Sequence, residues 1–334
     1  MMKVKHFFTI LIAMIVIVSN PVMAEDVLEV DTTQPIKEEL TAIEYLQQMQ
    51  KAYTQGNYEI IYVNNLNNKI EPKQLIHGVV DGQEIAYFRF LNGAMRESLQ
   101  YLQKISYFEQ GSPSYTLQSK HNRSVFATIA NYDYEKGKIS YDYLILGKGR
   151  IAGKQAIAIR MISKDEYRYS YIVWLDVDTF LPLRLDTINN ANIILDQVMV
   201  VSLSTSETIN PWLEKLSRQE LPQLLELPVS SQEESSEWIL NWLPTGFDII
   251  KSDQHKLIMH ENEPVSYIML SDGIVNVSIY ISAKQINLDG KKQIVKRGST
   301  ILYTYQRDDY EVNIVGDIPV VTAKTLIKSI SRKH

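Results

Sequence analysis

The chain has 334 residues, of which 45% are hydrophobic and 22% are charged, and its formal net charge at pH 7 is −5. This composition is typical of a folded globular protein, and the length favours two domains over one. An acidic chain is not expected to bind nucleic acid. The complete absence of cysteine excludes thiolate nucleophiles, thiolate zinc sites and thiol redox chemistry.

The first 24 residues have the pattern of a secretory signal peptide. Lys3, Lys5 and His6 give a positive start, Phe7 to Val18 form an apolar run, and the small-residue motif at 22–24 ends in Ala24. The apolar run is shorter than the ~20 residues of a spanning helix, so we expect cleavage rather than a retained anchor. The mature chain then has 32 basic and 39 acidic residues, a formal charge of −7.

Residues 25–38 are polar and acidic and are expected to form a loose start. A helix is predicted to begin at Thr41, which forms a capping box with Glu44, and to end at Gly56. Its apolar positions recur at helical spacing: Ile43, Leu46, Met49 and Tyr53. From residue 58 to 203 the pattern is mainly short β runs separated by turns such as Asp81-Gly82, which indicates an α+β or barrel-like plan.

Residues 168–186, RYSYIVWLDVDTFLPLRLD, predict a β-hairpin without an obvious polar face. One face carries Tyr169, Tyr171, Val173 and Leu175. The other is expected to carry Ile172 and Trp174, followed across the turn by Leu181, Leu183 and Leu185. Since an antiparallel pair usually has one wet face, a helix, a partner or a ligand is expected to cover the second.

Prolines and a polar tract mark residues 206–236 as an interdomain linker. The predicted domains are therefore 39–205 and 237–334. The second has four expected β runs, at 264–270, 275–283, 299–306 and 310–315, and a closing amphipathic helix from about Thr322.

Local catalytic motifs are missing. No two of the six histidines have zinc-site spacing, residues 147–154 (GKGRIAGK) do not form a Walker loop, and Asp176-Val-Asp178 lacks the rest of a calcium loop. The sequence predicts no catalytic residue, no cofactor and no metal, and we expect a protein that is not an enzyme.

Twenty tyrosines stand out, several in alternation, as in Tyr132-Asp-Tyr134 and Tyr141-Asp-Tyr143. An apolar ring with a polar tip suits a half-wet concave surface that holds an amphiphile or an extended peptide. Tyrosine is also simply a good strand former, and the sequence leaves both readings open.

Four stretches carry a family resemblance: RYSYIVWLDVDTFLPLRLD, WLPTGF (242–247), SDGIVNVSIYI (271–281) and YEVNIVGDIPVVTAKTLIKSI (310–330). In this order they resemble the RseB/MucB family of periplasmic regulators of the sigma-E envelope stress response. The resemblance implies a first domain like LolA and LolB, an unclosed antiparallel β-barrel packed on helices, and a smaller C-terminal α+β domain. It also implies a soluble periplasmic protein that binds the anti-sigma factor RseA, shields it from the protease DegS, and releases it when lipopolysaccharide or another lipid binds.

From these strand faces we expect lipid or partner contacts at six aromatic residues: Tyr62, Phe88, Tyr132, Tyr143, Tyr171 and Trp174. Two basic clusters are candidate phosphate contacts or else solvated loop charges: Lys148, Arg150 and Lys154 in the first domain, and Lys291, Lys292, Lys296 and Arg297 in the second. A homodimer stays possible. The alternative function is a periplasmic lipid or lipoprotein carrier of LolA type, which the fold alone would allow.

Overall fold

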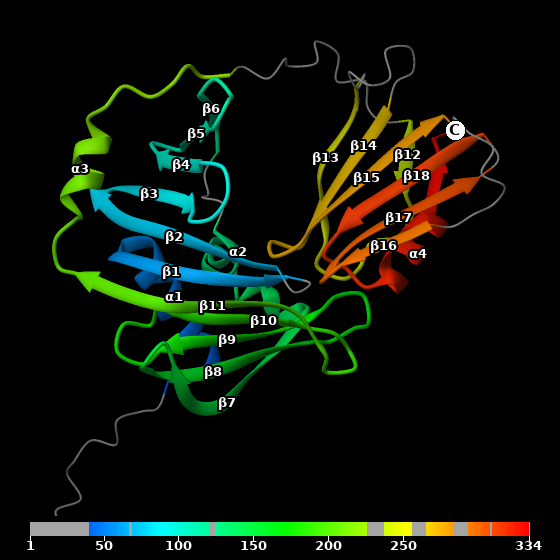
Figure 1. Cartoon of the computed structure of the whole chain (residues 1–334). Coiled ribbons are helices and arrows are strands. Elements are labelled where there is room, and N and C mark those ends of the chain that lie inside the picture. Colours follow the sequence, from blue (N-terminus) through cyan, green and yellow to red (C-terminus); the bar gives the residue numbers. More distant parts are fainter. Residues whose placement is uncertain are drawn as a thin grey trace, which may run out of the picture. The chain divides into compact units, whose positions relative to one another are not determined.

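The computed structural model describes residues 40–66, 69–119, 124–225, 237–255, 265–283, 293–307 and 309–333. The signal peptide and loose segment predicted for residues 1–38 lie outside these ranges. Within them the chain forms two sheets of six or more strands, one in each half of the sequence (Figure 1).

Helix α1 (Ala42–Gln55) begins and ends where the sequence predicts. The Thr41 hydroxyl accepts from the Glu44 amide at 3.3 Å, and the Glu44 carboxylate accepts from the Thr41 amide at 2.7 Å, so the capping box is complete. Leu46, Met49 and Tyr53 are fully buried. Loss of one such side chain typically costs about 2–5 kcal/mol, so this helix is fixed by its apolar stripe.

The N-terminal sheet has eleven strands in the order β6-β5-β4-β3-β2-β1-β11-β10-β9-β8-β7, all antiparallel neighbours. The strands are β1 (Asn57–Leu66), β2 (Lys69–Val80), β3 (Gln83–Phe90), β4 (Arg96–Tyr101), β5 (Lys104–Glu109), β6 (Tyr115–Gln118), β7 (Tyr141–Ile151), β8 (Lys154–Ser163), β9 (Ser170–Asp176), β10 (Pro182–Ile188) and β11 (Ile194–Ser206). The first and last strands pair at the centre, and the end strands β6 and β7 do not pair with each other. The sheet is therefore unclosed, as predicted.

The two faces of this sheet pack on different helices. The inner face packs on α1 and on α2 (Val125–Ala130) through the main apolar cluster, which includes Ile60, Leu75 and Val173. The outer face packs on α3 (Pro211–Ser217) through a smaller cluster around Ile85 and Leu213. A short 3₁₀ turn, η1 (Lys136–Ile139), leads into β7.

The hairpin of β9 and β10 differs from the sequence prediction in one respect. Its register places Leu185 opposite Val173 on the inner face, and Arg184 opposite Trp174 on the outer face. The expectation that the leucines share the face of Trp174 is wrong, because a register shift between Pro182 and Arg184 changes the alternation across the turn. The hairpin therefore has an ordinary polar face.

That polar face is an ordered row of side chains. Arg184 donates to both carboxylate oxygens of Asp186 at 2.9 Å, and Gln197 donates to the same carboxylate at 2.9 Å. The half-buried Trp174 lies between the Arg184 guanidinium, 5.9 Å from the ring centre, and Gly149 of β7. Polar groups, with the Trp174 ring and the half-buried Ile172 among them, complete this side of the hairpin without a second apolar layer.

The C-terminal sheet has six antiparallel strands in the order β13-β14-β15-β18-β17-β16, and a separate pair joins β12 to β19. The strands are β12 (Trp238–Leu240), β13 (Asp248–His255), β14 (Val265–Ser271), β15 (Asn276–Ala283), β16 (Gln293–Arg297), β17 (Thr300–Arg307), β18 (Tyr310–Gly316) and β19 (Ile330–Arg332). Helix α4 (Val320–Ser329) packs on this sheet through Ala323, Leu326 and Ile327. The predicted α+β class is confirmed.

The domain boundaries of the sequence analysis stay a prediction. Within the predicted linker, 206–236, the structure places α3 against the outer face of the N-terminal sheet. The residues after α3 continue along the edge strand β6, where Thr116 donates from its amide to the Gln223 carbonyl at 2.9 Å and accepts from the Leu225 amide at 2.8 Å. The linker thus covers the open edge of β6, which removes one unpaired strand edge.

Candidate functional site

Arg168, the first residue of the hairpin stretch, is fully buried and binds the nearby Asp165 and two distant segments of the chain. Its guanidinium donates to Asp165 at 3.2 Å and to Asp272, in the turn before β15, at 3.2 Å. It also donates to the carbonyl oxygen of Thr245, in the stretch WLPTGF. One side chain of the N-terminal domain therefore joins two of the C-terminal stretches that carry the family resemblance.

Asp272 is held for this contact by its own turn. Its Oδ1 accepts from the amides of Ile274 at 2.9 Å and Val275 at 2.8 Å, which leaves Oδ2 for Arg168. Burial raises the pKa of Asp272, while these amides and Arg168 oppose the rise. Burial alone would lower the pKa of Arg168, but the interactions with Tyr141, Asp165 and Asp272 have a larger effect in the opposite direction. The pKa of Arg168 is therefore raised, and the guanidinium stays charged.

The residues before β9 bind the fourth stretch, which ends in α4. The Tyr169 hydroxyl donates to the carbonyl of Ile318 at 3.0 Å, and the Thr322 hydroxyl donates to the carbonyl of Tyr167 at 2.7 Å. Burial, followed by the charges of Asp317 and Asp196, raises the pKa of Tyr169 to about 12, which keeps this donor protonated at neutral pH. All four family-like stretches thus meet around residues 167–169, a region that we call the junction.

The backbone at the junction admits only glycine at one position. Gly246 has φ +80°, and a Cβ there would lie 2.5 Å from the Ser140 hydroxyl oxygen. An L-residue is strained at this φ and has no room, so the close approach of the Thr245 carbonyl to Arg168 depends on Gly246.

Five tyrosines lie beside the junction and contact one another edge to face or at a tilt; this tyrosine cluster consists of Tyr132, Tyr134, Tyr141, Tyr143 and Tyr171. Ring centres are 5.3 Å apart for Tyr132 and Tyr134, and 6.1 Å apart for Tyr141 and Tyr171. Burial raises the pKa of all five hydroxyls, so they stay neutral. Tyr132 also packs against Gly273, next to Asp272, which extends the cluster to the junction.

The structure brings together only some of the predicted lipid or partner contacts. Tyr132, Tyr143 and Tyr171 belong to the tyrosine cluster. Tyr62 packs edge to face on Phe126 of α2, with ring centres 5.5 Å apart, and Phe88 packs on Phe90 at 5.5 Å. Trp174 pairs with Arg184 on the outer face and is half-buried, at the margin of the same apolar cluster. The role of all six in binding stays a prediction, and the five inner residues form part of the apolar cluster between sheet and helices.

The predicted anion contacts are dispersed. Lys148 and Arg150 are exposed on the end strand β7, while Lys154 pairs with the buried Asp176 at 3.3 Å. Arg297 is exposed on β16, and Lys291 lies outside the described residues. Their role as anion contacts likewise stays a prediction.

Sequence reasoning missed the junction itself. Nothing local in the sequence shows that Arg168 and Asp272, 104 positions apart, form an ion pair. The available signal was an arginine within a run of tyrosines, because a buried guanidinium needs carboxylate or carbonyl partners.

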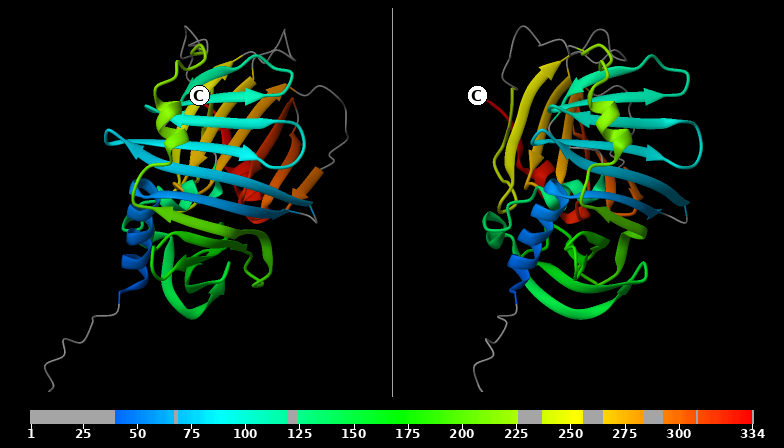
Figure 2. Two further views of the ribbon diagram at one scale, coloured as in Figure 1. Left: turned by 60° about the vertical axis from the view of Figure 1, so that its left-hand side comes forward. Right: turned by 90° about the vertical axis from the view of Figure 1, so that its left-hand side faces the viewer.

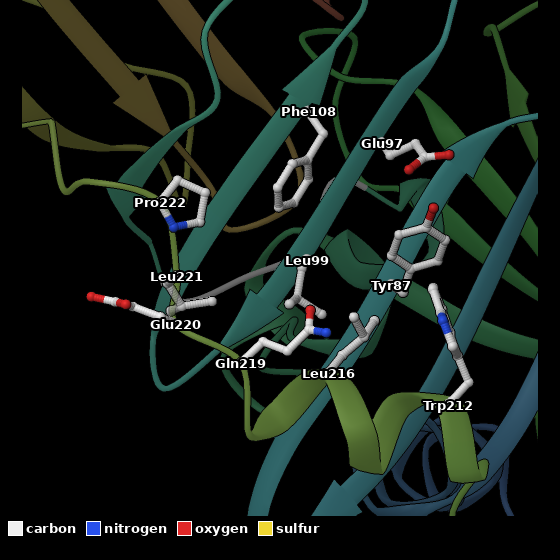
Figure 3. A pocket seen from close by; sticks show the side chains of 10 residues that line it. All are labelled: Tyr87, Glu97, Leu99, Phe108, Trp212, Leu216, Gln219, Glu220, Leu221 and Pro222. Atoms are coloured by element: carbon white, nitrogen blue, oxygen red, sulfur yellow. The ribbon is translucent and has the colours of Figure 1, made fainter.

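A small recess of about 250 Å³ opens on the outer face of the N-terminal sheet (Figure 3). Its floor is Tyr87, Glu97, Leu99 and Phe108 from β3, β4 and β5, and its wall is α3 with the residues after it: Trp212, Leu216, Gln219, Glu220, Leu221 and Pro222. Trp212 is 41% exposed and packs edge to face on Tyr87, with ring centres 4.4 Å apart. The recess is apolar with two carboxylates among its lining residues.

Among the described residues, no group of three or more histidine, aspartate and glutamate side chains is arranged to hold a metal ion. In the same part of the chain, no helix combines the length and the hydropathy that membrane crossing requires. Fold and site define a two-domain protein: an unclosed antiparallel sheet packed on helices, joined through a buried ion pair to an α+β domain.

Comparison with known families identifies this architecture. The model of the MucB/RseB N-terminal domain matches residues 41–225, and that of the MucB/RseB C-terminal domain matches residues 232–331. The chain therefore belongs to the MucB/RseB family, which confirms the resemblance seen in its four stretches.

Among curated relatives, the sigma-E factor regulatory protein RseB of Salmonella typhimurium is 32% identical over 285 residues, covering 85% of this chain and 89% of the relative. The sigma factor AlgU regulatory protein MucB of Pseudomonas aeruginosa is 23% identical over 303 residues, covering 89% and 92%. The relatives are thus regulatory proteins of sigma factors.

Among solved structures, the P. aeruginosa MucA/MucB complex aligns with a TM-score of 0.70 at 22% identity, covering 88% of this chain and 99% of the matched chain. A crystal structure of MucB with MucA(peri) aligns with a TM-score of 0.69 at 23% identity and the same coverage. These likenesses show that the fold is shared over both domains.

Proposed function

We propose that this protein is a periplasmic, non-enzymatic regulator that binds the periplasmic segment of an RseA-like transmembrane anti-sigma factor. By covering that segment it shields the anti-sigma factor from site-one proteolysis by DegS and so restrains sigma-E activity. The observation that carries the proposal is the family match over both domains. Two similar structures were solved with a MucA partner, which supports a partner of the same kind here.

The junction supports a binding role rather than a catalytic one. Its charged groups, Arg168, Asp165 and Asp272, are satisfied by one another and by main-chain atoms, which leaves no group free to act on a substrate. The arrangement is suited to fix one domain on the other. A partner that contacts both domains then meets a preorganised surface, which reduces the entropy lost on binding.

Release by lipid is the second part of the proposal. Lipopolysaccharide or another lipid is proposed to enter between the inner face of the N-terminal sheet and its helices, where Tyr62, Phe88 and the tyrosine cluster lie. Because this space is filled by packed side chains, entry requires α1 or α2 to move away from the sheet. Lipid releases the anti-sigma factor only if it binds the free protein better than the complex.

The alternative function is a lipid or lipoprotein carrier of LolA type. The unclosed sheet with an apolar inner face favours it. The C-terminal domain, tied to the first domain through Arg168, Tyr169 and Thr322, argues against it, because transport of an acyl chain would need only the first domain.

The test uses the mature protein, which we propose is residues 25–334, and the periplasmic segment of the anti-sigma factor from the same organism. Pull-down followed by isothermal titration calorimetry, with and without lipopolysaccharide, measures both ligands. Tight binding that lipopolysaccharide weakens supports regulation. Lipid uptake without anti-sigma binding would instead establish the carrier function.

A further inference from the structure

The C-terminal domain contains a cavity of about 420 Å³ between β17 and α4, two elements that lie next to each other in the views of Figures 1 and 2. It is lined by Tyr303, Tyr305, Arg307, Lys324, Ile327 and Lys328. Three of these six side chains are cations, and none is a carboxylate. The cavity is separate from the junction and from the residues proposed to take lipid acyl chains.

Strand and helix periodicity place the cations together. Tyr303, Tyr305 and Arg307 alternate along β17 and so point to the sheet face on which α4 packs. Lys324 and Lys328 stand four residues apart and so lie on one side of α4. The result is a tyrosine-lined cavity with cationic groups on both of the elements that form it.

The neighbouring strand adds a further cation to this face. The register pairs Lys296 of β16 with Ile301 and Ile294 with Tyr303, so Lys296 lies on the face of α4. Arg297 pairs with Thr300 and points to the opposite face. Alternation thus separates the two described members of the predicted basic cluster, and of these two Lys296 extends the cationic side of the cavity.

Two of the three cations of the cavity lack a carboxylate partner among the described residues. Arg307 donates to the Tyr310 hydroxyl at 3.4 Å, but Lys324 and Lys328 form no salt bridge with any carboxylate that the structure describes. Gathering like charges around a cavity is unfavourable, and a bound anion relieves the repulsion. In a chain of net charge −5, such a local excess of positive charge is a specific feature rather than a general background.

We propose that this cavity binds a phosphate monoester carried on a ligand with a ring or other apolar surface. The guanidinium of Arg307 provides a planar pair of donors for phosphate oxygens, and Lys324 and Lys328 provide the remaining positive charge. Two or three cations match a phosphate dianion better than a single carboxylate. Tyr305 and Ile327 offer the apolar surface for the group that carries the phosphate.

The first experiment measures binding of phenyl phosphate to the full mature protein by NMR, following the backbone amides of α4 and β17. The test variant is Lys324→Gln/Lys328→Gln. Its control is Lys51→Gln/Lys215→Gln, which removes the same charge from exposed positions on α1 and α3. The dissociation constant is expected to rise about tenfold or more in the test variant, to change less than twofold in the control, and to rise with added NaCl.

A second pair of probes distinguishes the source of the phosphate. Phosphatidylcholine vesicles with and without phosphatidic acid test a lipid headgroup, while phenyl phosphate tests a soluble ester. Binding of either that depends on Lys324 and Lys328 supports the proposal and names the source. Absence of binding to both, equal weakening by the control variant, or stronger binding of an acidic peptide than of either phosphate probe would overturn it. Circular dichroism of both variants confirms that they are folded.

Discussion

Replacing Arg168 with methionine tests whether the buried ion pair holds the two domains together. The Arg168 side chain is 0% exposed and the Asp272 side chain 1% exposed, so water cannot replace the lost contact. Removing one partner of a buried pair typically costs about 3–5 kcal/mol. We expect a loss near the lower end of this range for two reasons. Asp272 keeps two amide hydrogen bonds and can take up a proton, and Asp165 is 22% exposed, so water can solvate its carboxylate.

The assay is urea unfolding combined with differential scanning calorimetry. Wild type is expected to unfold with the two domains coupled, and Arg168→Met to lose about 3 kcal/mol and to separate into two transitions. The double variant Arg168→Met/Asp272→Asn should cost less than the sum of the two single variants by about 1–3 kcal/mol, because no unpaired charge remains.

The matched control is Arg218→Met, whose pair with Glu214 is exposed at 76% and 43% and is expected to contribute less than about 1 kcal/mol. A loss of less than about 1 kcal/mol for Arg168→Met, or strict additivity in the double variant, would refute the reasoning.

Three further results are expected. Gly246→Ala should lower the free energy of unfolding by about 1–2 kcal/mol from backbone strain, and further through the contact of the new Cβ with Ser140. Its control is Gly153→Ala, at φ +77° with no neighbour within 4 Å, which should lose only the part due to strain. Equal losses of the two variants in urea unfolding would show that the contact with Ser140 contributes nothing. In the folded protein the pKa of Tyr169 is raised from 10.0 to about 12, so its contribution to stability is present below pH 10 and is lost as the pH rises towards 12. Tyr169→Phe should therefore reduce the alkaline loss of stability by up to about 2.7 kcal/mol. The same dependence of stability on pH in wild type and variant would contradict this. Trp174→Ala should fold and weaken binding of lipid or of the anti-sigma segment measured by calorimetry; normal affinity for both would make Trp174 a structural residue only.

Helix α1 and most of the second domain follow from local patterns. The capping box at Thr41 and the apolar spacing up to Tyr53 predict α1 correctly, because its ends are set by nearby side chains. The expected β runs of the C-terminal domain correspond to β14, β15, β17 and β18. The strands β13 and β16 and the helices α2 and α3 were missed, since β16 is exposed and the two helices are short, so their periodicity is weak.

The candidate site was predictable only in part. Alternating tyrosines left two readings open, a surface that holds a ligand or ordinary strand formers. The structure places Tyr132, Tyr143 and Tyr171 in one cluster, and their role in binding stays a prediction. The hairpin faces were misassigned at the leucines, because a register shift cannot be read from alternation within a single strand. The basic residues of the phosphate cavity come from β17 and α4, and only their packing brings them together.

The sequence by itself determined the cysteine-free composition of the chain, its α+β class, the bounds of its first helix and its family, and it predicts export. These depend on composition, on local capping and on the order of four stretches along the chain. Only the tertiary structure decided that those four stretches meet around residues 167–169 and that Lys296 and Arg297 point to opposite faces. Such contacts join residues 77 to 155 positions apart, or depend on strand register, and neither is encoded in local periodicity.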